Sequence, residues 1–390
     1  MLRLLTFSTL FPDSARPHHG VFVENRLRHL VATGAAESTV LAPIPWFPSA
    51  NPRFGAHARL AAVPELERRH GLDIHHPRYL VIPRVGMSVA PALLYWAARR
   101  ALARLVADGL EFDAIDAHYV YPDGVAAIWL GAHFGKPVTI TARGSDVTQL
   151  PDYALPRAQI RMALRRADAL MGVSAALCRR MVELGADPGK VTTLRNGIDT
   201  QVFRPADRAA ARAALGLTRT TLISVGHLIE RKRNHLTIAA LAELPDIDFI
   251  LVGDGPERAR LEAQAAGLGL GGRVRFLGVQ PHHELPRFYT AADAMVLASS
   301  REGWANVLLE AMACGTPVIA SDIPGNDEVV QGPEAGRIVA ENTPAGFAAA
   351  IRALFAAGTD REATRAYAQP FSWDETSAGQ LAIFRRITGR

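Results

Sequence analysis

Short apolar runs alternate with longer amphipathic segments along the whole chain. The runs are rich in Val, Ile and Leu, which favour β-strands, and they cover residues 2–8, 38–44, 114–119, 137–142, 169–174 and 191–195, then 220–226, 248–254, 274–278, 294–299 and 316–321. Segments with helical spacing lie between them, for example at residues 24–32, 155–167, 257–266 and 305–313. This alternation predicts an α/β protein with two doubly wound parallel sheets.

The pattern breaks at about residues 200–218, where a turn, a proline and a polar helix interrupt the succession of strands. We therefore expect an N-terminal Rossmann-like domain of residues 1–204 and a C-terminal Rossmann-like domain of residues 205–370, facing each other across a cleft. Residues 371–390 predict a C-terminal helix, with Ser372 and Asp374 as cap-like residues, that packs back on the N-terminal domain. In such sheets ligands bind beyond the carboxyl ends of the strands.

The net charge of +5 is unevenly distributed. Residues 1–205 hold 24 Lys and Arg against 17 Asp and Glu, a balance of +7, and the remainder holds 19 against 21, a balance of −2. An anionic partner of the N-terminal domain, such as a membrane surface or a lipid-linked pyrophosphate, fits this distribution, and so do ordinary solvated arginines. No basic stripe interleaved with aromatic residues occurs, so we expect no nucleic-acid partner.

No run of about 18 uncharged apolar residues occurs, which predicts that no helix spans a membrane. The apolar start lacks a signal-peptide cleavage site, so we expect a cytoplasmic protein that works at the inner face of the cytoplasmic membrane. Residues 87–109 combine aromatics, leucines and arginines, which fits either a helix on a membrane surface or one packed on the N-terminal sheet. Cys178 and Cys314 are expected to be reduced and buried.

Two glutamates, Glu302 and Glu310, lie eight residues apart around an apolar helix in SREGWANVLLEAMACGTPVIAS (300–321). Glu310 lies inside that helix, and a carboxylate there needs a partner, for which a sugar hydroxyl is suitable. Free N–H groups at the helix start, residues 304–307, suit a phosphate. The arrangement predicts a pocket for a nucleotide diphosphate sugar. Taken alone, it also fits a capping Glu302 and a solvent-facing Glu310.

Several motifs resemble glycosyltransferase family 4, whose members are retaining enzymes with the GT-B fold. Residues 302–321 resemble its glutamate–seven–glutamate signature, and SVGHLIERKRNHL (224–236) resembles its loop with basic residues for the donor pyrophosphate. PHHGVFVENRLRHL (17–30), DAHYVYPDGVAA (116–127) and TARGSDV (141–147) resemble its glycine loop with the first helix and its acceptor-side loops. The resemblance covers nearly the whole chain and is greatest to bacterial polysaccharide enzymes of the teichuronic-acid type.

The resemblance implies roles for the matching residues. Lys232, with Arg231 beside it, would stabilise the leaving diphosphate, while Glu310 would accept from the ribose hydroxyls and Glu302 would hold the donor sugar. The candidate catalytic residues are Lys232, Glu302 and Arg143. The candidate donor-binding residues are Gly20, Gly226, Arg231, Lys232, Glu302, Trp304, Ala305, Asn306, Val307 and Glu310, and the acceptor-side candidates are His19, Asp123 and Asp146. The resemblance further implies a glycan or lipid-linked acceptor, with neither a metal nor a cofactor besides the nucleotide sugar.

Two positions depart from the family pattern. His227 stands where the family often has Arg, and it cannot supply a permanent fork of positive charge, so either Arg231 replaces it or Lys232 holds the pyrophosphate alone. Arg143 stands where the family often has His, and it suits an anionic acceptor, a sugar carboxylate or the leaving phosphate.

Other functions remain open to a protein with this pattern. A sugar-nucleotide epimerase of similar fold would turn over the donor without an acceptor. A two-lobed sugar-binding protein would need a secretion signal or a DNA-binding head, and neither is seen in the sequence. A dehydrogenase is disfavoured because no glycine-rich fingerprint follows the first strand.

Overall fold

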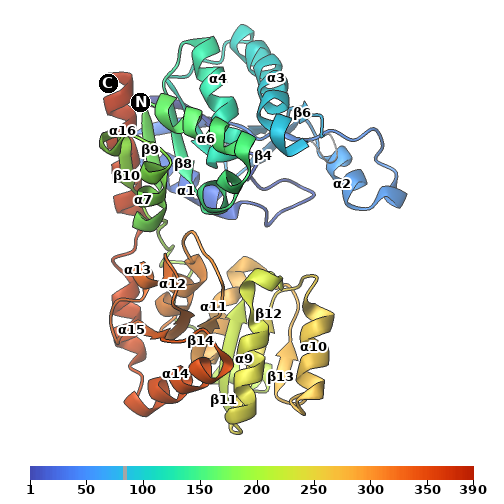
Figure 1. Cartoon of the computed structure of the whole chain (residues 1–390), viewed down its shortest axis with the longest axis vertical. Helices are drawn as coiled ribbons and strands as arrows, with labels where there is room; N and C mark the ends of the chain where they lie inside the picture. Colours follow the sequence, from blue (N-terminus) through green and yellow to red (C-terminus); the bar gives the residue numbers. More distant parts are fainter. Residues whose placement is uncertain (82–85) are drawn as a thin grey trace. The chain divides into compact units, whose positions relative to one another are not determined.

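The computed structural model describes residues 1–81 and 86–390, and these residues form two compact units (Figure 1). Unit 1 comprises Met1–Asn196 together with Trp373–Arg390, and unit 2 comprises Gly197–Ser372. The division after residue 196 lies somewhat before the domain boundary that the strand pattern places at 204/205.

Unit 1 is built on one large sheet. Its strands are β1 (Leu2–Phe7), β2 (Ala36–Leu41), β3 (Ile44–Pro45), β4 (Leu66–Arg69), β5 (Leu72–His75), β6 (Arg78–Tyr79), β7 (Ala114–His118), β8 (Val138–Ala142), β9 (Ala169–Gly172) and β10 (Val191–Thr193). Its helices are α1 (Val21–Ala32), α2 (Ala56–Ala62), α3 (Gly86–Ala107), α4 (Val125–Phe134), α5 (Ser145–Thr148), α6 (Ala154–Arg166), α7 (Ala175–Glu183) and α16 (Trp373–Thr388).

The large sheet of unit 1 has the strand order β10-β9-β8-β7-β1-β2-β5-β4, and β3 pairs with β6 separately. After β1 the chain adds β2, β5 and β4 on one side of the sheet, and after β7 it adds β8, β9 and β10 on the other side. The strand order therefore reverses between β1 and β7. Buried Leu2 and Leu4 of β1 pack in one cluster with Leu30 of α1 and Phe384 of α16. The terminal helix α16 is therefore part of the core of unit 1, as the sequence predicts.

Unit 2 repeats this architecture on a smaller scale. Its strands are β11 (Thr220–Val225), β12 (Ile247–Val252), β13 (Val274–Phe276), β14 (Ala294–Leu297), β15 (Val318–Ser321) and β16 (Gly336–Val339). Its helices are α8 (Arg208–Leu215), α9 (Asn234–Ala240), α10 (Arg258–Gly267), α11 (Leu285–Ala291), α12 (Asn306–Ala313), α13 (Asn326–Val329), α14 (Pro344–Ala357) and α15 (Arg361–Ala368).

The parallel sheet of unit 2 has the order β13-β12-β11-β14-β15-β16, so its strand order reverses between β11 and β14. In the central strands β11, β12, β14 and β15, side chains on both faces of the sheet are nearly all buried, which is typical of a parallel sheet covered by helices on both sides. On one face, Leu222 and Phe249 pack with Ile238 of α9 and Phe347 of α14.

Every strand expected from the sequence overlaps an observed one, but β3, β4, β5, β6 and β16 were not expected. The prediction that the first sheet is wholly parallel is wrong at its edge, because β4 pairs antiparallel with β5. The two strands read LERR and LDIH, and charged residues are common on edge strands because they discourage pairing with other chains. Such short, charged segments lack the apolar run by which the other strands were recognised.

Candidate functional site

The candidate donor site of unit 2 lies where its strand order reverses. Lys232 and Arg231 belong to a short 3-10 turn that follows β11, and Glu302 lies in the loop that follows β14. Since β11 and β14 are neighbouring parallel strands, the two loops emerge side by side at the same edge of the sheet. This is the position at which open α/β sheets bind their ligands.

The three charged side chains in these loops contact one another. Nζ of Lys232 lies 2.8 Å from Oε1 of Glu302, and Nη1 of Arg231 lies 3.0 Å from Oε2 of the same carboxylate. Burial opposes ionisation of Glu302, but the positive charges of Lys232 and Arg231 outweigh it and hold the pKa of Glu302 below its usual value. Two cations share one carboxylate, which leaves the cluster with one surplus positive charge.

Gly226, the first residue after β11, lies directly beneath this cluster. Its φ of 143° lies in the region that favours glycine, and a Cβ at this position would lie 3.8 Å from Nζ of Lys232. Gly226 therefore contributes to the site by its backbone conformation, since a Cβ there would only reach ordinary van der Waals contact with the lysine.

The start of α12 follows the Glu302 loop. Trp304 is buried and its ring lies 6.2 Å from that of Phe371, while Ala305 precedes the helix with a side chain that cannot cap it. Asn306 and Val307 form the first turn. The amide groups of a helix start attract anions, and the loop that carries Glu302 leads directly into this one.

Glu310 lies in the second turn of α12 and is buried. Its Oε2 accepts a hydrogen bond of 2.9 Å from the hydroxyl of Tyr289, and its Oε1 lies 3.6 Å from Nε2 of His282. The nearby carboxylate of Glu310 raises the pKa of His282 against the opposing effect of burial, and burial together with this carboxylate raises the pKa of Tyr289. Glu310 thus has partners within the protein, which the sequence did not reveal.

In unit 1, the corresponding reversal of strand order brings the loop after β1 next to the residues that follow β7. Both oxygens of buried Asp123 accept from Thr9, one from its amide and the other from its hydroxyl at 3.0 Å. Nε2 of His19 lies 3.1 Å from the carbonyl oxygen of Thr9. Burial raises the pKa of Asp123 to about 7, although the Thr9 bonds oppose this.

Gly20 precedes α1 and packs against the same loop. Its φ is 70°, and a Cβ would lie 2.3 Å from the carbonyl carbon and oxygen of Leu10, which is far inside contact distance. Only glycine fits here. Together with His19 and Asp123, Gly20 fixes the conformation of the loop after β1.

Arg143 follows β8 and is buried within a chain of polar contacts. Its Nη2 lies 2.7 Å from Nδ1 of His118, and Nε2 of His118 lies 3.2 Å from Oδ2 of Asp116. Its Nη1 donates to Oδ1 of Asn196 at 3.1 Å, and that oxygen also lies 3.4 Å from Nη1 of Arg26. Burial lowers the pKa of Arg143 to about 9 and that of Arg26 to about 10, so both remain charged at neutral pH.

Asp146 serves the backbone of the same region. Its carboxylate accepts from the amides of Val120, Arg143 and Gly144 at 2.7 to 3.2 Å. These bonds join the loop after β7 to the loop after β8. Asp146 therefore has a structural task in unit 1, whatever its relation to an acceptor.

Two family models match complementary parts of the chain. The model described as "Glycosyltransferase Family 4" matches residues 20–202, and the model described as "Glycosyl transferases group 1" matches residues 207–370. The two matches correspond to the two units. The chain belongs to these glycosyltransferases.

Curated relatives of this glycosyltransferase include the D-inositol 3-phosphate glycosyltransferase of Mycobacterium tuberculosis, which is 35% identical over 238 residues. That match covers 57% of this chain and 49% of the relative, so the chain spans about half the length of the curated relatives it matches.

Solved structures show that the glycosyltransferase has the GT-B fold. Sucrose-phosphate synthase from Thermosynechococcus elongatus superposes with a TM-score of 0.80 at 22% identity, covering 100% of this chain and 99% of that one. Anabaena Alr3699/HepE in complex with UDP gives a TM-score of 0.73 at 20% identity, covering 97% and 98%.

The two departures from the family pattern have different surroundings in this glycosyltransferase. His227 is exposed, and its Nδ1 lies 2.5 Å from the carbonyl oxygen of Asp254. Arg231 instead lies beside Lys232 at Glu302. Arg143, in contrast, is buried and held by His118 and Asn196.

Sequence reasoning missed most of the residues that hold the candidates in place, namely Tyr289, His282, His118, Asp116 and Arg26. Most of them lie within strands or helices of ordinary composition, and only their contacts mark them. His118 had the best available signal, because it ends a buried strand at the edge where ligands bind.

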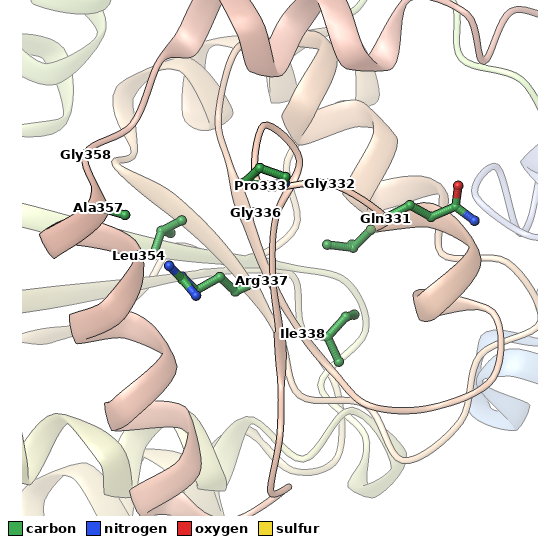
Figure 2. A pocket seen from close by; sticks show the side chains of 10 residues that line it. Gln331, Gly332, Pro333, Gly336, Arg337, Ile338, Leu354, Ala357 and Gly358 are labelled. Carbon is green, nitrogen blue, oxygen red and sulfur yellow. The ribbon is translucent and has the colours of Figure 1, made fainter.

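A separate cavity in unit 2 does not coincide with the candidate site. It has a volume of about 470 Å³ and lies between the edge strand β16 and α14 (Figure 2). Arg337 is the single charged residue in its lining, and none of the candidate donor-binding residues belongs to it. It lacks the paired charges of the Lys232 cluster.

Proposed function

We propose that this protein is a retaining glycosyltransferase that moves a sugar from a nucleotide diphosphate sugar to a hydroxyl group of a polysaccharide, glycolipid or lipid-linked acceptor. The observation that carries the proposal is the cluster of Lys232, Arg231 and Glu302 in the loops after β11 and β14, where the strand order reverses. One surplus positive charge beside a helix start suits a diphosphate.

In the proposed reaction, the acceptor oxygen forms a bond to the anomeric carbon of the sugar. The bond between that carbon and the β-phosphate oxygen breaks, and its electron pair leaves with the diphosphate. The departing diphosphate takes up the proton of the acceptor hydroxyl on the same face of the sugar, which retains the anomeric configuration. The protein lowers the barrier by positioning the reactants and by stabilising the charge that develops on the diphosphate.

Each residue of the donor site has a proposed role in this scheme. Lys232 and Arg231 contact the diphosphate, which draws them partly away from Glu302. The freed carboxylate oxygens of Glu302 then accept hydroxyl groups of the donor sugar, and Glu310 accepts the ribose hydroxyls. The amides of residues 304–307 add hydrogen bonds to the phosphates.

Arg143, His19, Asp123 and Asp146 remain the proposed acceptor-side residues. The name of the curated relative, a D-inositol 3-phosphate glycosyltransferase, includes a phosphorylated compound, and Arg143 would suit an anionic group of this kind. The basic balance of residues 1–205 further supports an acceptor held at an anionic membrane surface, so we place the reaction in cell-envelope glycan synthesis at the inner face of the cytoplasmic membrane.

The proposal is tested by a screen of nucleotide sugars followed by product analysis. A true donor should raise the melting temperature, because a ligand that binds only the folded state stabilises it by mass action. UDP-sugars are tried first, since related structures of HepE contain UDP and UDP-glucose. The best donor is then incubated with glycolipid and polysaccharide acceptors, and NMR of the product reports the anomeric configuration.

Three results would contradict the proposal. An inverted product would exclude the retaining mechanism. Conversion of the donor to its epimer without any acceptor would support a sugar-nucleotide epimerase instead. Binding of free sugars, with no affinity for any nucleotide sugar, would support a non-catalytic sugar-binding protein.

A further inference from the structure

Large apolar side chains are exposed mainly in one part of unit 1. Among the described residues of the span 46–106 they are Trp46, Phe54, Leu66, Leu80, Val81, Met87, Trp96 and Val106. In unit 2 the exposed large apolar residues are Val202, Leu268 and Val279, which include no aromatic ring. Single exposed apolar residues are ordinary, but a concentration that includes tryptophan marks a surface that meets another apolar phase.

Helix α3 carries the most informative of these residues. Trp96 is 53% exposed, although Leu94 and Ala98 on either side of it are buried, so the ring projects from the outward face of the helix. The guanidinium of Arg99 lies 4.3 Å from the centre of the Trp96 ring, within the range of a cation–π contact. Arg100 and Arg104 follow Trp96 by four and eight residues, which puts all three on one exposed face. We call Trp96, Arg99, Arg100 and Arg104 the α3 face.

A groove of about 450 Å³ opens beside the α3 face. Arg100 and Arg104 line one side of it, and Arg78 lines the other. Arg78 is fixed in place because its guanidinium donates to the carbonyl oxygens of Leu60, at 2.7 Å, and Val63. Glu65 and Asp108 also line the groove, so its three arginines outnumber its acids.

We propose that the α3 face docks on an anionic phospholipid bilayer, with a headgroup phosphate in the groove and the ring of Trp96 in the interfacial zone. A helix with one apolar side against the protein and an outward side of arginine and tryptophan lies in the plane of such an interface. Each basic residue near an anionic surface adds attraction, and tryptophan is favoured at the boundary between headgroups and acyl chains. Among the residues that the structure describes, no helix is long and apolar enough to cross a bilayer, so this contact would be peripheral.

Charge complementarity identifies the occupant as a bilayer rather than a protein. An acidic protein partner would meet the arginines, but it would not account for the exposed ring of Trp96 beside Arg99, nor for a second exposed apolar residue, Leu66, in the lining of the groove. The purpose of this contact rests on the proposed function, because it would bring the enzyme to a lipid-linked acceptor. Its test does not require that function.

The test is co-sedimentation of the full-length protein with vesicles of phosphatidylcholine alone or of phosphatidylcholine with one-quarter phosphatidylglycerol. The wild-type protein should bind only the anionic vesicles, and binding should fall with added salt. Arg100→Glu with Arg104→Glu should lower binding at least about tenfold, and Trp96→Ala several-fold. The matched control is Arg165→Glu with Arg166→Glu, which makes the same change of charge on exposed positions of α6 and should leave binding nearly unchanged.

Each other outcome overturns the proposal. If the α3 double variant and the α6 control lost vesicle binding equally, net charge alone would govern binding. If both kept full vesicle binding, the contact would lie elsewhere on the protein. Binding to neither vesicle would remove the bilayer as partner, and a shift of melting temperature with inorganic phosphate alone would make the groove a simple anion site. Melting temperature and nucleotide-sugar binding are measured on every variant, so that a misfolded variant or a failure of the proposed transferase function is recognised separately from a failure to dock.

Discussion

The two units share one architecture but use the reversal of strand order differently. In unit 2, the loops after β11 and β14 present Lys232 and Arg231 around Glu302, and side chains of this cluster retain 10 to 33% of their exposure. In unit 1, Arg143 and its neighbours around β7 and β8 are almost completely buried and bind one another. The charged cluster of unit 2 stays partly accessible, whereas the charged groups of unit 1 are held by protein partners.

The comparison teaches that polar residues at equivalent sheet edges have different consequences when they are changed. A charged side chain that is partly exposed and shares its protein partner with another can exchange that partner for a substrate group at low cost in free energy. A buried charge with protein partners contributes to folding, because its partners lose their hydrogen bonds when it is removed. We therefore expect changes in unit 2 to affect turnover and changes in the buried network of unit 1 to affect stability.

The largest effect is expected for Lys232→Ala. Loss of this cation removes charge stabilisation of the leaving diphosphate, and transfer should fall by about 10²–10³-fold while the melting temperature changes little. The measurement is kcat/KM for sugar transfer, with Lys190→Ala in unit 1 as the control. Unchanged transfer by Lys232→Ala would remove the central residue of the proposed site.

A stability effect is expected for Arg26→Ala. This side chain is fully buried in α1 and donates to the carbonyl oxygen of Leu194 at 2.9 Å, so truncation leaves both a cavity and an unpaired acceptor. The free energy of unfolding, measured by urea denaturation, should fall by about 3 kcal/mol. Arg28→Ala on the exposed side of the same helix is the control and should cost less than about 0.5 kcal/mol.

Arg26→Met sharpens the same comparison, because it restores most of the volume without the charge. A recovery of about half of the lost stability would attribute the effect to packing. An Arg26→Ala variant as stable as the control would show that the buried network of unit 1 does not hold the unit together.

The smallest effect is a pH dependence of donor binding in unit 2. The pKa of His282 is raised by Glu310, so the protonated ring holds that carboxylate at low pH and releases it as the pH rises through the raised pKa. Asp199 also favours the protonated ring, and Tyr289 binds the other oxygen of Glu310. If Glu310 accepts the ribose hydroxyls, the donor Kd should fall several-fold between about pH 6 and pH 8.

His282→Asn should remove this pH dependence, because asparagine does not titrate. The matched control is His283→Asn, since His283 is the exposed neighbour and faces Glu284 rather than Glu310. Calorimetric titration of the donor at several pH values decides the question. A dependence that persists in His282→Asn would mean that another group titrates.

The sequence predicted the two-sheet fold well because parallel strands that are buried on both faces must be apolar runs. Glu302 and Lys232 could be found because they lie in short loops between recognisable elements. Tyr289 could not be found, because its importance comes from its contact with Glu310, 21 positions away. The edge strands β4 and β5 were not predicted for a local reason, because their charged residues give them the composition of loops.

The position of α16 has a consequence for how the protein is made. Leu381 and Phe384 complete a core cluster whose other members include Leu2 and Leu4, so strand β1 is translated long before the helix that covers it. Unit 2 is a single uninterrupted segment that is translated in full before that helix and emerges from the ribosome ahead of it. Co-translational folding should therefore finish in the inserted unit first, and a nascent chain stalled before Trp373 would hold unit 1 with one wall of its core open to solvent.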